Sequence, residues 1–170
     1  MSTVALITHN LRSTHNVGSL LRTAEGLGVD MVYFTGYTPY PLSPDDTRLP
    51  HLSAKLTRQI HKTALGAELT QPWAHFEDIE QLVSKLKKDG FKVCALEQTK
   101  SAVPLPNFVP ADKTAVIVGN EPDGIDSQTL LLCDTHLVIP MKGQKESFNV
   151  AQAAAMCLYH ITVKEVASSK

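Results

Sequence analysis

Short apolar runs, separated by segments of helical periodicity, constrain the fold of this 170-residue chain more than any other feature. Five such runs indicate buried strands, at residues 4–7, 31–35, 91–96, 114–118 and 136–139. They are rich in β-branched residues and nearly continuous, which is typical of strands covered on both faces. Strands that alternate with helices favour parallel pairing. The sequence therefore predicts an α/β fold with a mainly parallel sheet flanked by helices.

Three segments show the helical spacing of apolar residues: 17–27, 79–86 and 150–161. Two proline-rich stretches, residues 36–50 and 100–113, interrupt the alternation of strands and helices. Neither stretch is flanked by enough sequence to form a second hydrophobic core, so we expect both to be long surface loops. Residues 1–170 should form a single domain.

The composition is that of an ordinary folded domain, with 43% apolar and 19% charged residues. The 16 Lys and Arg nearly balance the 17 Asp and Glu, so any contact with a nucleic acid must be a local basic patch. The three cysteines are odd in number and widely spaced, which argues against a disulfide framework or a zinc site. The sequence shows no signal peptide and no run long enough to span a membrane. We expect a soluble, cytoplasmic protein that binds no metal.

The first candidate motif is HNVGSLLR, at the start of the first helical segment. Asn16 could cap this helix through its side chain. Gly18 is unusual, because glycine inside a helix costs roughly 1 kcal/mol relative to alanine. Arg22 lies one turn beyond Gly18 on the same side of the helix. The two could line a shallow surface for a phosphate or for another backbone, although a solvated arginine is the simpler alternative.

The second motif is GNEPDG, which directly follows a predicted strand. Ligands of open parallel sheets bind beyond the carboxyl ends of the strands, so this turn lies where chemistry is expected. Gly119 permits close approach of a ligand, Pro122 stiffens the turn, and Gly124 supports a bend that few residues tolerate. Turn geometry does not require the carboxylate of Glu121, and this residue is therefore the functional candidate.

The third motif, IPMKGQKESFNV, leads from the last strand into the last helix. Asn149 and Gln152 resemble a capping box, and Ser147 could cap the helix instead, so one of these polar side chains is spare. Free backbone N–H groups at this helix start would favour a carboxylate or a phosphate.

Taken in this order, the motifs resemble those of the SpoU (TrmH-type) branch of the SPOUT RNA methyltransferases, over nearly the whole chain. The matching residues are Asn16, Gly18 and Arg22 in the first motif, Gly119, Glu121 and Gly124 in the second, and Ile139, Pro140, Met141, Gly143, Ser147, Asn149 and Val150 in the third. The stretch KTALGAE, residues 62–68, is also similar to one common in these enzymes.

The resemblance implies an α/β sheet whose C-terminal part is threaded into a trefoil knot that binds S-adenosylmethionine. The cofactor contacts it implies lie on three loops, at Leu96, Glu97, Gly119, Ile139, Met141, Gly143, Ser147 and Asn149. The catalytic residues it implies are Arg22, Asn16, Glu121, Ser147 and Asn149. Enzymes of this kind are homodimers that methylate a ribose 2′-hydroxyl in tRNA or rRNA, and the compact chain favours tRNA.

For Arg22 the resemblance implies the role of activating base, beside the cofactor of the partner subunit. A guanidinium stays protonated near neutral pH, and removing its proton there would cost roughly 7 kcal/mol. Unless an RNA phosphate takes the proton, we expect Arg22 to polarise the ribose hydroxyl and to anchor the adjacent phosphate.

A basic stripe is the candidate RNA surface. His51, Lys55, Arg58 and Lys62 would line one side of a helix over residues 52–65, with Lys55, Arg58 and Lys62 as the RNA-binding candidates. A solvated helix face is the simpler alternative.

Two other functions compete with the methyltransferase. A dinucleotide oxidoreductase would need a GxGxxG motif that the chain lacks, and a non-catalytic knotted RNA-binding protein would bind no cofactor.

Overall fold

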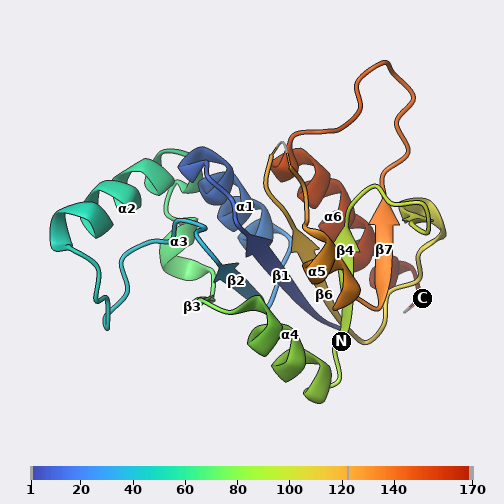
Figure 1. The fold of residues 1–170 in the computed structure, drawn as a ribbon, viewed down its shortest axis with the longest axis horizontal. Helices are drawn as coiled ribbons and strands as arrows, with labels where there is room; N and C mark the ends of the chain where they lie inside the picture. The colour runs from blue at the N-terminus through green and yellow to red at the C-terminus, as the bar shows by residue number, and fades with distance from the viewer. Residues whose placement is uncertain (1, 122, 169–170) are drawn as a thin grey trace.

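The computed structural model describes residues 2–121 and 123–168, and in the last helix the side chains as far as Val163. Within this part of the chain, seven parallel strands form one sheet in the order β3-β2-β1-β6-β4-β7-β5 (Figure 1). The strands are β1 (Thr3–His9), β2 (Met31–Thr35), β3 (Trp73–Phe76), β4 (Lys92–Leu96), β5 (Val103–Pro104), β6 (Lys113–Val118) and β7 (Thr135–Val138). The predicted α/β fold with a mainly parallel sheet is confirmed. The short strands β3 and β5 were not predicted.

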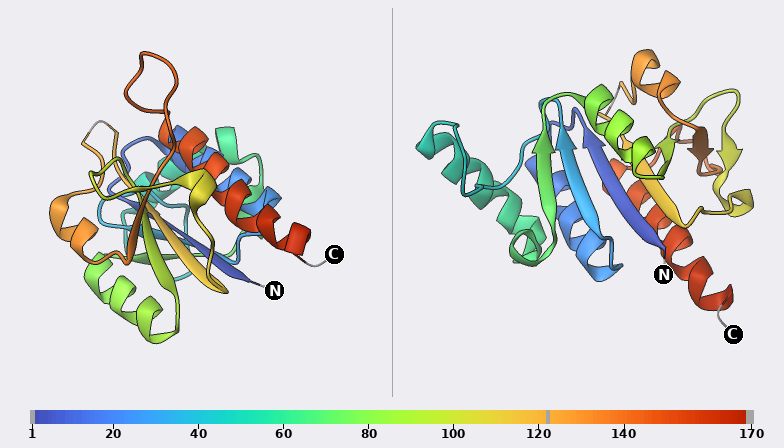
Figure 2. Two further views of the ribbon diagram at one scale, coloured as in Figure 1. Left: turned by 90° about the vertical axis from the view of Figure 1, so that its right-hand side faces the viewer. Right: turned by 90° about the horizontal axis from the view of Figure 1, so that it is seen from below.

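Helices cover both faces of the sheet. They are α1 (Thr14–Gly26), α2 (Pro50–Ala64), α3 (Ala67–Thr70), α4 (Ile79–Lys88), α5 (Ser127–Leu131) and α6 (Val150–Ser168), with a short 3-10 helix η1 (Leu105–Asn107). Seen from below in Figure 2, α1 and α6 lie on one face of the sheet, while α4 and α5 lie on the other. Helix α2 extends outward beyond the β3 edge (Figure 1).

The central strands β1, β4 and β6 are buried on both faces, as their continuous apolar runs predict. In β1, Val4 and Leu6 pack into the core cluster beneath α1 and α6, while Ala5 and Ile7 pack into the cluster beneath α4. Successive side chains of a strand point to opposite faces. A strand between two helical layers therefore favours apolar residues at most of its positions.

The strand order brings three loops to one edge of the sheet. Strand β4 pairs with both β6 and β7, and all three run in the same direction. Their carboxyl ends, and the loops that follow them, are therefore neighbours, although β4 and β7 are about 40 residues apart in the chain. The loop after β7 is long and stands clear of the body of the protein (Figure 1).

The two proline-rich stretches differ from each other. In residues 36–50, Arg48 donates to the carboxylate of Asp46 and to the backbone oxygens of Tyr40 and Pro41, and its guanidinium carbon lies 3.6 Å from the centroid of the Tyr40 ring. This loop is a surface segment, as predicted, with a compact internal structure. The prediction of a surface loop over residues 100–113 is wrong in part, because the segment forms β5 and η1 and buries Leu105 and Phe108 in the core.

None of the helices in the described ranges is long and apolar enough to cross a membrane. Pro122, which we expect to stiffen the turn after β6, lies outside the described residues.

Candidate functional site

The loops after β4, β6 and β7 enclose a cavity of about 190 Å³ at the carboxyl edge of the sheet. Six of the eight residues predicted to bind the cofactor line it: Leu96, Glu97, Gly119, Ile139, Met141 and Ser147. The other two, Gly143 and Asn149, do not line this cavity. They line an adjacent surface hollow that Met141 and Ser147 share. The strand order thus brings most of the predicted set together.

Close backbone packing shapes the turn after β6. A Cβ atom added to Gly119 would lie 2.6 Å from the side chain of Ile125 and 2.7 Å from the backbone of Gly124. Gly124 has φ 71°, a conformation that side chains other than glycine rarely adopt. A Cβ atom there would lie 2.4 Å from the carboxylate of Glu97. Gly119 therefore has no room for a side chain, and at Gly124 a side chain would be strained by the positive φ and would displace the Glu97 carboxylate.

Glu97 holds the loop after β4 to its two neighbours. Its backbone N–H donates to the carbonyl oxygen of Leu137 at 2.9 Å, and its carboxylate accepts the N–H of Ile125 at 2.9 Å. The same carboxylate accepts the N–H of Gln98 at 2.9 Å. One residue thus connects the loop after β4 to β7 and to the turn after β6.

A polar cluster beside the cavity joins Asn16, Glu121 and Asn149. The amide nitrogen of Asn16 donates to Glu121 at 3.1 Å, and that of Asn149 donates to the side-chain oxygen of Asn16 at 3.2 Å. The second carboxylate oxygen of Glu121 accepts the N–H of Val150, the first residue of α6, at 2.7 Å. Residues from three distant motifs therefore form one hydrogen-bonded unit.

One expectation about helix capping is corrected, and one choice that the sequence left open is decided. Ser13, not Asn16, is the N-cap of α1, because its hydroxyl accepts the N–H of Asn16 at 3.2 Å. Asn16 lies inside the helix, and its side chain is free to serve the polar cluster. At α6 the cap is Asn149, whose side-chain oxygen accepts the N–H of Ala151 at 2.9 Å. Ser147 is the spare side chain, since its hydroxyl has no partner among the described residues and is exposed beside the cavity.

Gly18 and Arg22 do not form a joint surface for a phosphate. Gly18 is buried against α2, where an added Cβ would lie 2.3 Å from the carbonyl oxygen of Ile60. Of the two alternatives left open for this glycine, the structure favours another backbone. Arg22 is exposed and borders an apolar cleft between α1 and α6, apart from the polar cluster.

The predicted basic stripe lies on α2. The helix spans Pro50–Ala64, close to the predicted bounds, and its buried side carries Ser53, Ile60 and Ala64. On the other side, Lys55, Arg58 and Lys62 are exposed. The C-terminal end of the stripe approaches the start of α1, because the Thr63 hydroxyl donates to the carbonyl oxygen of His15 at 2.9 Å.

The cavity is acidic. Its lining includes Glu97, Glu121 and Glu146, and no Lys, Arg or His from the described part of the chain. Carboxylates that line a cavity create a negative potential that favours a positively charged ligand. No group of three or more His, Cys, Asp or Glu side chains within residues 2–121 and 123–163 is arranged to hold a metal ion.

A second set of polar residues at this edge was missed by the sequence analysis. It consists of His9, Asn10, Thr35, Tyr37 and Asn120, at the tips of β1, β2 and β6. Burial, partly offset by the charge of Asp126, lowers the pKa of His9. The local signals for this set were the pair of polar residues, His9 and Asn10, that follows the first apolar run, and the position of Asn120 inside the GNEPDG motif.

Comparison with known proteins identifies the family. The model of the SpoU rRNA Methylase family matches residues 3–159. A putative TrmH family tRNA/rRNA methyltransferase from Staphylococcus aureus is 30% identical over 161 residues, which are 95% of this chain and 58% of that protein. An uncharacterised tRNA/rRNA methyltransferase from Mycobacterium tuberculosis is 31% identical over 163 residues, which are 94% of this chain and 51% of that protein. The chain thus spans little more than half the length of these two relatives.

Solved structures share the fold at lower sequence identity. The SpoU methyltransferase AviRb from Streptomyces viridochromogenes, in complex with AdoMet, superposes with a TM-score of 0.80 at 19% identity, over 97% of this chain and 58% of that one. The A. aeolicus TrmH/SpoU tRNA modifying enzyme gives a TM-score of 0.79 at 20% identity, over 99% and 78%. The trefoil knot itself stays a prediction. Because the family model matches most of its length, this chain belongs to the SpoU rRNA methylase family.

Proposed function

We propose that this chain is an RNA methyltransferase that transfers a methyl group from S-adenosylmethionine to a ribose 2′-hydroxyl, preferentially in tRNA. The observation that carries the proposal is the cluster of Asn16, Glu121 and Asn149 beside the three-loop cavity. The AdoMet bound by the similar AviRb supports the cofactor. A similar structure concerned with 2-OH methylation of C/U34 on tRNA supports that substrate. It has a TM-score of 0.76 at 17% identity, and 98% of each chain is covered.

The cavity fits this cofactor chemically. Leu96 and Ile139 offer apolar walls for an adenine ring. The closely packed turn at Gly119 and Gly124 keeps side chains away from the backbone groups that a nucleoside would contact. The acidic lining suits the positive charge of a sulfonium. When bound, S-adenosylmethionine supplies an already activated methyl group, so the protein's task is to position the acceptor hydroxyl and to help remove its proton.

The polar cluster is suited to positioning. Glu121 accepts from Asn16 and from the start of α6, which fixes the amide of Asn16 with its oxygen toward Asn149. The exposed hydroxyl of Ser147 remains available to hydrogen-bond to a ligand. In this proposal Arg22 polarises the ribose hydroxyl and anchors the neighbouring phosphate, because a guanidinium does not readily give up its proton.

Arg22 can take this part only if a second subunit brings it to the site. Within one chain it borders the cleft between α1 and α6 and does not contact the polar cluster. The same face exposes Tyr159, Met156 and Val163, which are 58%, 36% and 38% exposed. Adjacent apolar side chains of this size favour a protein interface. The proposal therefore includes a homodimer through α1 and α6.

The first experiment supplies labelled S-adenosylmethionine with bulk tRNA or bulk rRNA from cells that lack the gene. We expect label in tRNA, at positions that resist alkaline cleavage, because a 2′-O-methyl group removes the hydroxyl that alkaline cleavage needs. Label in rRNA alone would favour the rRNA alternative, and label on a base would contradict the ribose reaction. Calorimetry with S-adenosylmethionine tests the non-catalytic alternative, which predicts no binding.

A second experiment mixes two inactive variants, Arg22→Ala and Glu121→Ala. If each site takes Arg22 from one subunit and Glu121 from the other, a heterodimer holds one intact site, and mixing restores part of the activity. A mixture as inactive as its components would contradict the shared site.

The pH–rate profile of Arg22→Lys distinguishes the two possible roles of Arg22, activating base and polarising group. A largely restored rate that follows an ordinary lysine titration would favour the base over the polarising group.

A further inference from the structure

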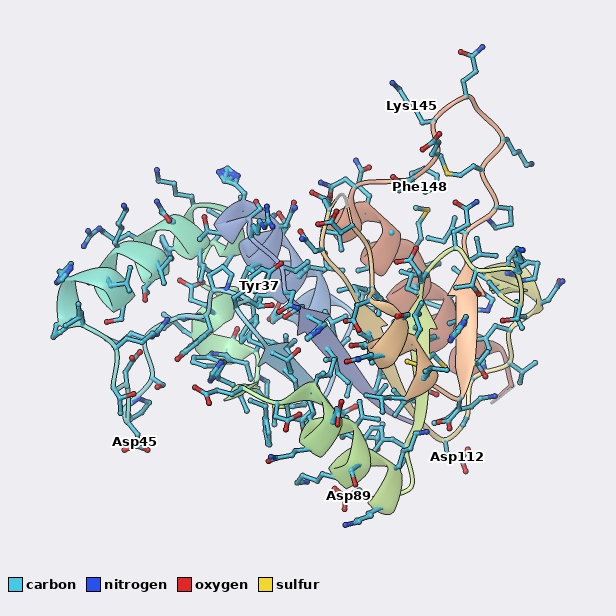
Figure 3. All side chains as sticks on the ribbon, in the orientation of Figure 1. Tyr37, Asp45, Asp89, Asp112, Lys145 and Phe148 are labelled. Carbon is cyan, nitrogen blue, oxygen red and sulfur yellow. The ribbon has the colours of Figure 1, made fainter. Side chains whose placement is uncertain are left out.

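Tyr37 is an exposed aromatic residue held rigidly at the carboxyl edge of the sheet. It follows β2 by two positions, and 56% of it is exposed. Figure 3 shows Tyr37 toward the tips of the β1 and β2 strands, well apart from Asp89 at the far end of α4. A single exposed aromatic ring is common on protein surfaces. The contacts that hold this one are what point to a ligand.

Two residues beside Tyr37 have an unusual backbone conformation: Gly36, which precedes it in the chain, and Asn10, which binds its backbone N–H. Asn10 and Gly36 have φ 56° and φ 61°, both in the left-handed region. The side-chain oxygen of Asn10 accepts the N–H of Tyr37 at 3.2 Å, and a Cβ on Gly36 would lie 1.9 Å from that oxygen. A left-handed residue other than glycine costs about 1 kcal/mol or more and recurs at functional sites.

A chain of hydrogen bonds orients Asn10 toward Tyr37. The Thr35 hydroxyl donates to the carbonyl oxygen of Thr8, so its oxygen accepts from Nδ1 of His9 at 2.9 Å. In the neutral ring, Nε2 of His9 then accepts the amide N–H of Asn10 at 3.1 Å. This order leaves the amide oxygen of Asn10 facing the backbone of Tyr37.

The far end of Tyr37 is also held. The amide nitrogen of Asn120 donates to the phenol oxygen at 3.2 Å, and Asn120 is buried, with 7% exposed. The partly buried Asn10 at the backbone N–H and the buried Asn120 at the phenol oxygen thus hold a ring that itself faces solvent. Asn120 is the chain neighbour of Glu121, so the ring lies close to the polar cluster.

A cation accompanies the ring. Arg12 is exposed, and its guanidinium carbon lies 6.0 Å from the centroid of the Tyr37 ring. No carboxylate in the described part of the chain pairs with it. Arg12 precedes α1, which carries Asn16. The basic stripe of α2 reaches the same helix start through the contact between Thr63 and His15.

We propose that the Tyr37 ring and the Arg12 guanidinium form a subsite that stacks an unpaired base of the RNA substrate next to the ribose that is methylated. The inference rests on the proposed function. Single-stranded RNA is recognised largely by stacking of bases on aromatic rings and guanidinium planes. A rigid ring loses little entropy when a base stacks on it, and the free cation is available to the phosphate.

The test compares Tyr37→Leu, Tyr37→Phe and Arg12→Gln with wild type. Affinity for bulk tRNA and bulk rRNA is measured by filter binding, affinity for S-adenosylmethionine by calorimetry, and folding by thermal melting. We expect Tyr37→Leu to weaken RNA binding about 5- to 100-fold, the range for loss of one stacked base, and Tyr37→Phe by less than about 3-fold. Arg12→Gln should weaken it and reduce the salt slope by about one unit.

Lys88→Gln on α4 is the matched control for loss of an exposed positive charge, and it should change neither affinity. Cofactor affinity should be unchanged in every variant. Tyr37→Leu and Tyr37→Phe both remove the acceptor of the buried Asn120 amide and should lower the melting temperature alike, whereas Arg12→Gln and Lys88→Gln should not change it. If wild type binds RNA and Tyr37→Leu binds it equally well, the subsite is refuted while the proposed function stands. If wild type binds neither RNA fraction, the proposed function and the subsite are refuted together. Equal losses in Tyr37→Phe and Tyr37→Leu would assign the effect to the hydroxyl and refute stacking.

Discussion

Replacing Gly18 by alanine tests the packing of α1 on α2, because helix propensity and packing predict opposite changes in stability. Helix propensity alone predicts that alanine stabilises a helix by about 1 kcal/mol relative to glycine. In this structure the added Cβ would lie 2.1 Å from the Thr63 hydroxyl, 2.3 Å from the Ile60 carbonyl oxygen and 2.9 Å from the Ala64 nitrogen. Two of these three atoms belong to the backbone of α2, so a rotamer change cannot relieve the contact.

The magnitude follows from the shift that alanine requires. The contact with the Ile60 oxygen is about 1 Å shorter than the 3.4 Å at which ordinary contact begins. The two helices must therefore separate by about 1 Å. Overpacking of this kind costs up to about 3 kcal/mol. After the gain in propensity, we expect Gly18→Ala to lower the free energy of unfolding by about 2 kcal/mol.

The assay is urea denaturation followed by circular dichroism, and the control lies on the same helix. Gly26 ends α1 and has nothing within 4 Å of an added Cβ, so Gly26→Ala should be neutral or stabilising, by up to about 1 kcal/mol. All proteins are compared at one concentration, because dimerisation would make the midpoint depend on it. If Gly18→Ala is as stable as wild type, the helices can separate freely and the reasoning fails.

Three further predictions concern the basic stripe, His9 and the thiols. Reversing charge in Arg58→Glu with Lys62→Glu should weaken RNA binding and its salt dependence while S-adenosylmethionine affinity is kept, and unchanged RNA affinity would contradict the stripe. Burial lowers the pKa of His9, so the stability it contributes is present above about pH 6.5 and is lost as the pH falls through the folded pKa. Urea midpoints at about pH 7.5 and about pH 5.5 should therefore differ more for wild type than for His9→Gln, and equal differences would refute this. Burial also raises the pKa of the thiols, to about 12 in Cys94 and Cys157 and to about 11 in Cys133. A disulfide reagent should therefore react slowly with the thiols of the native protein and fast after unfolding. A thiol that reacts fast in the native protein would be contrary evidence.

The sequence predicts those parts of the fold in which local pattern and final environment agree. Five strands were found because their apolar runs are continuous. Strand β3 was missed because all four of its residues are only partly buried, so it has no such run. Strand β5 has two residues and ends in Pro104, which an edge strand tolerates but which weakens any strand signal.

Local sequence patterns do not show which distant residues meet in the site. Those residues could be predicted only where the resemblance to a known family identified them. Asn16 and Glu121 are 105 positions apart, and no spacing rule pairs them. Local reasoning assigned Asn16 to a helix cap, which Ser13 provides. Tyr37 was missed because an exposed residue after a strand leaves no periodic signal. Its role depends on Asn120, 83 positions away.

Glu121 links the chemistry of the site to the completion of the fold. Both of its partners are donors, the amide nitrogen of Asn16 on α1 and the backbone N–H of Val150 at the start of α6. A carboxylate can accept from both, and its charge is favourable at a helix N-terminus. A glutamine has a single oxygen, so its NH₂ group would face one of these donors. The carboxylate is therefore required by the geometry of two helix starts. It can orient Asn16 and Asn149 only after α6 has docked beside α1, so the polar cluster forms only once the C-terminal helix is in place.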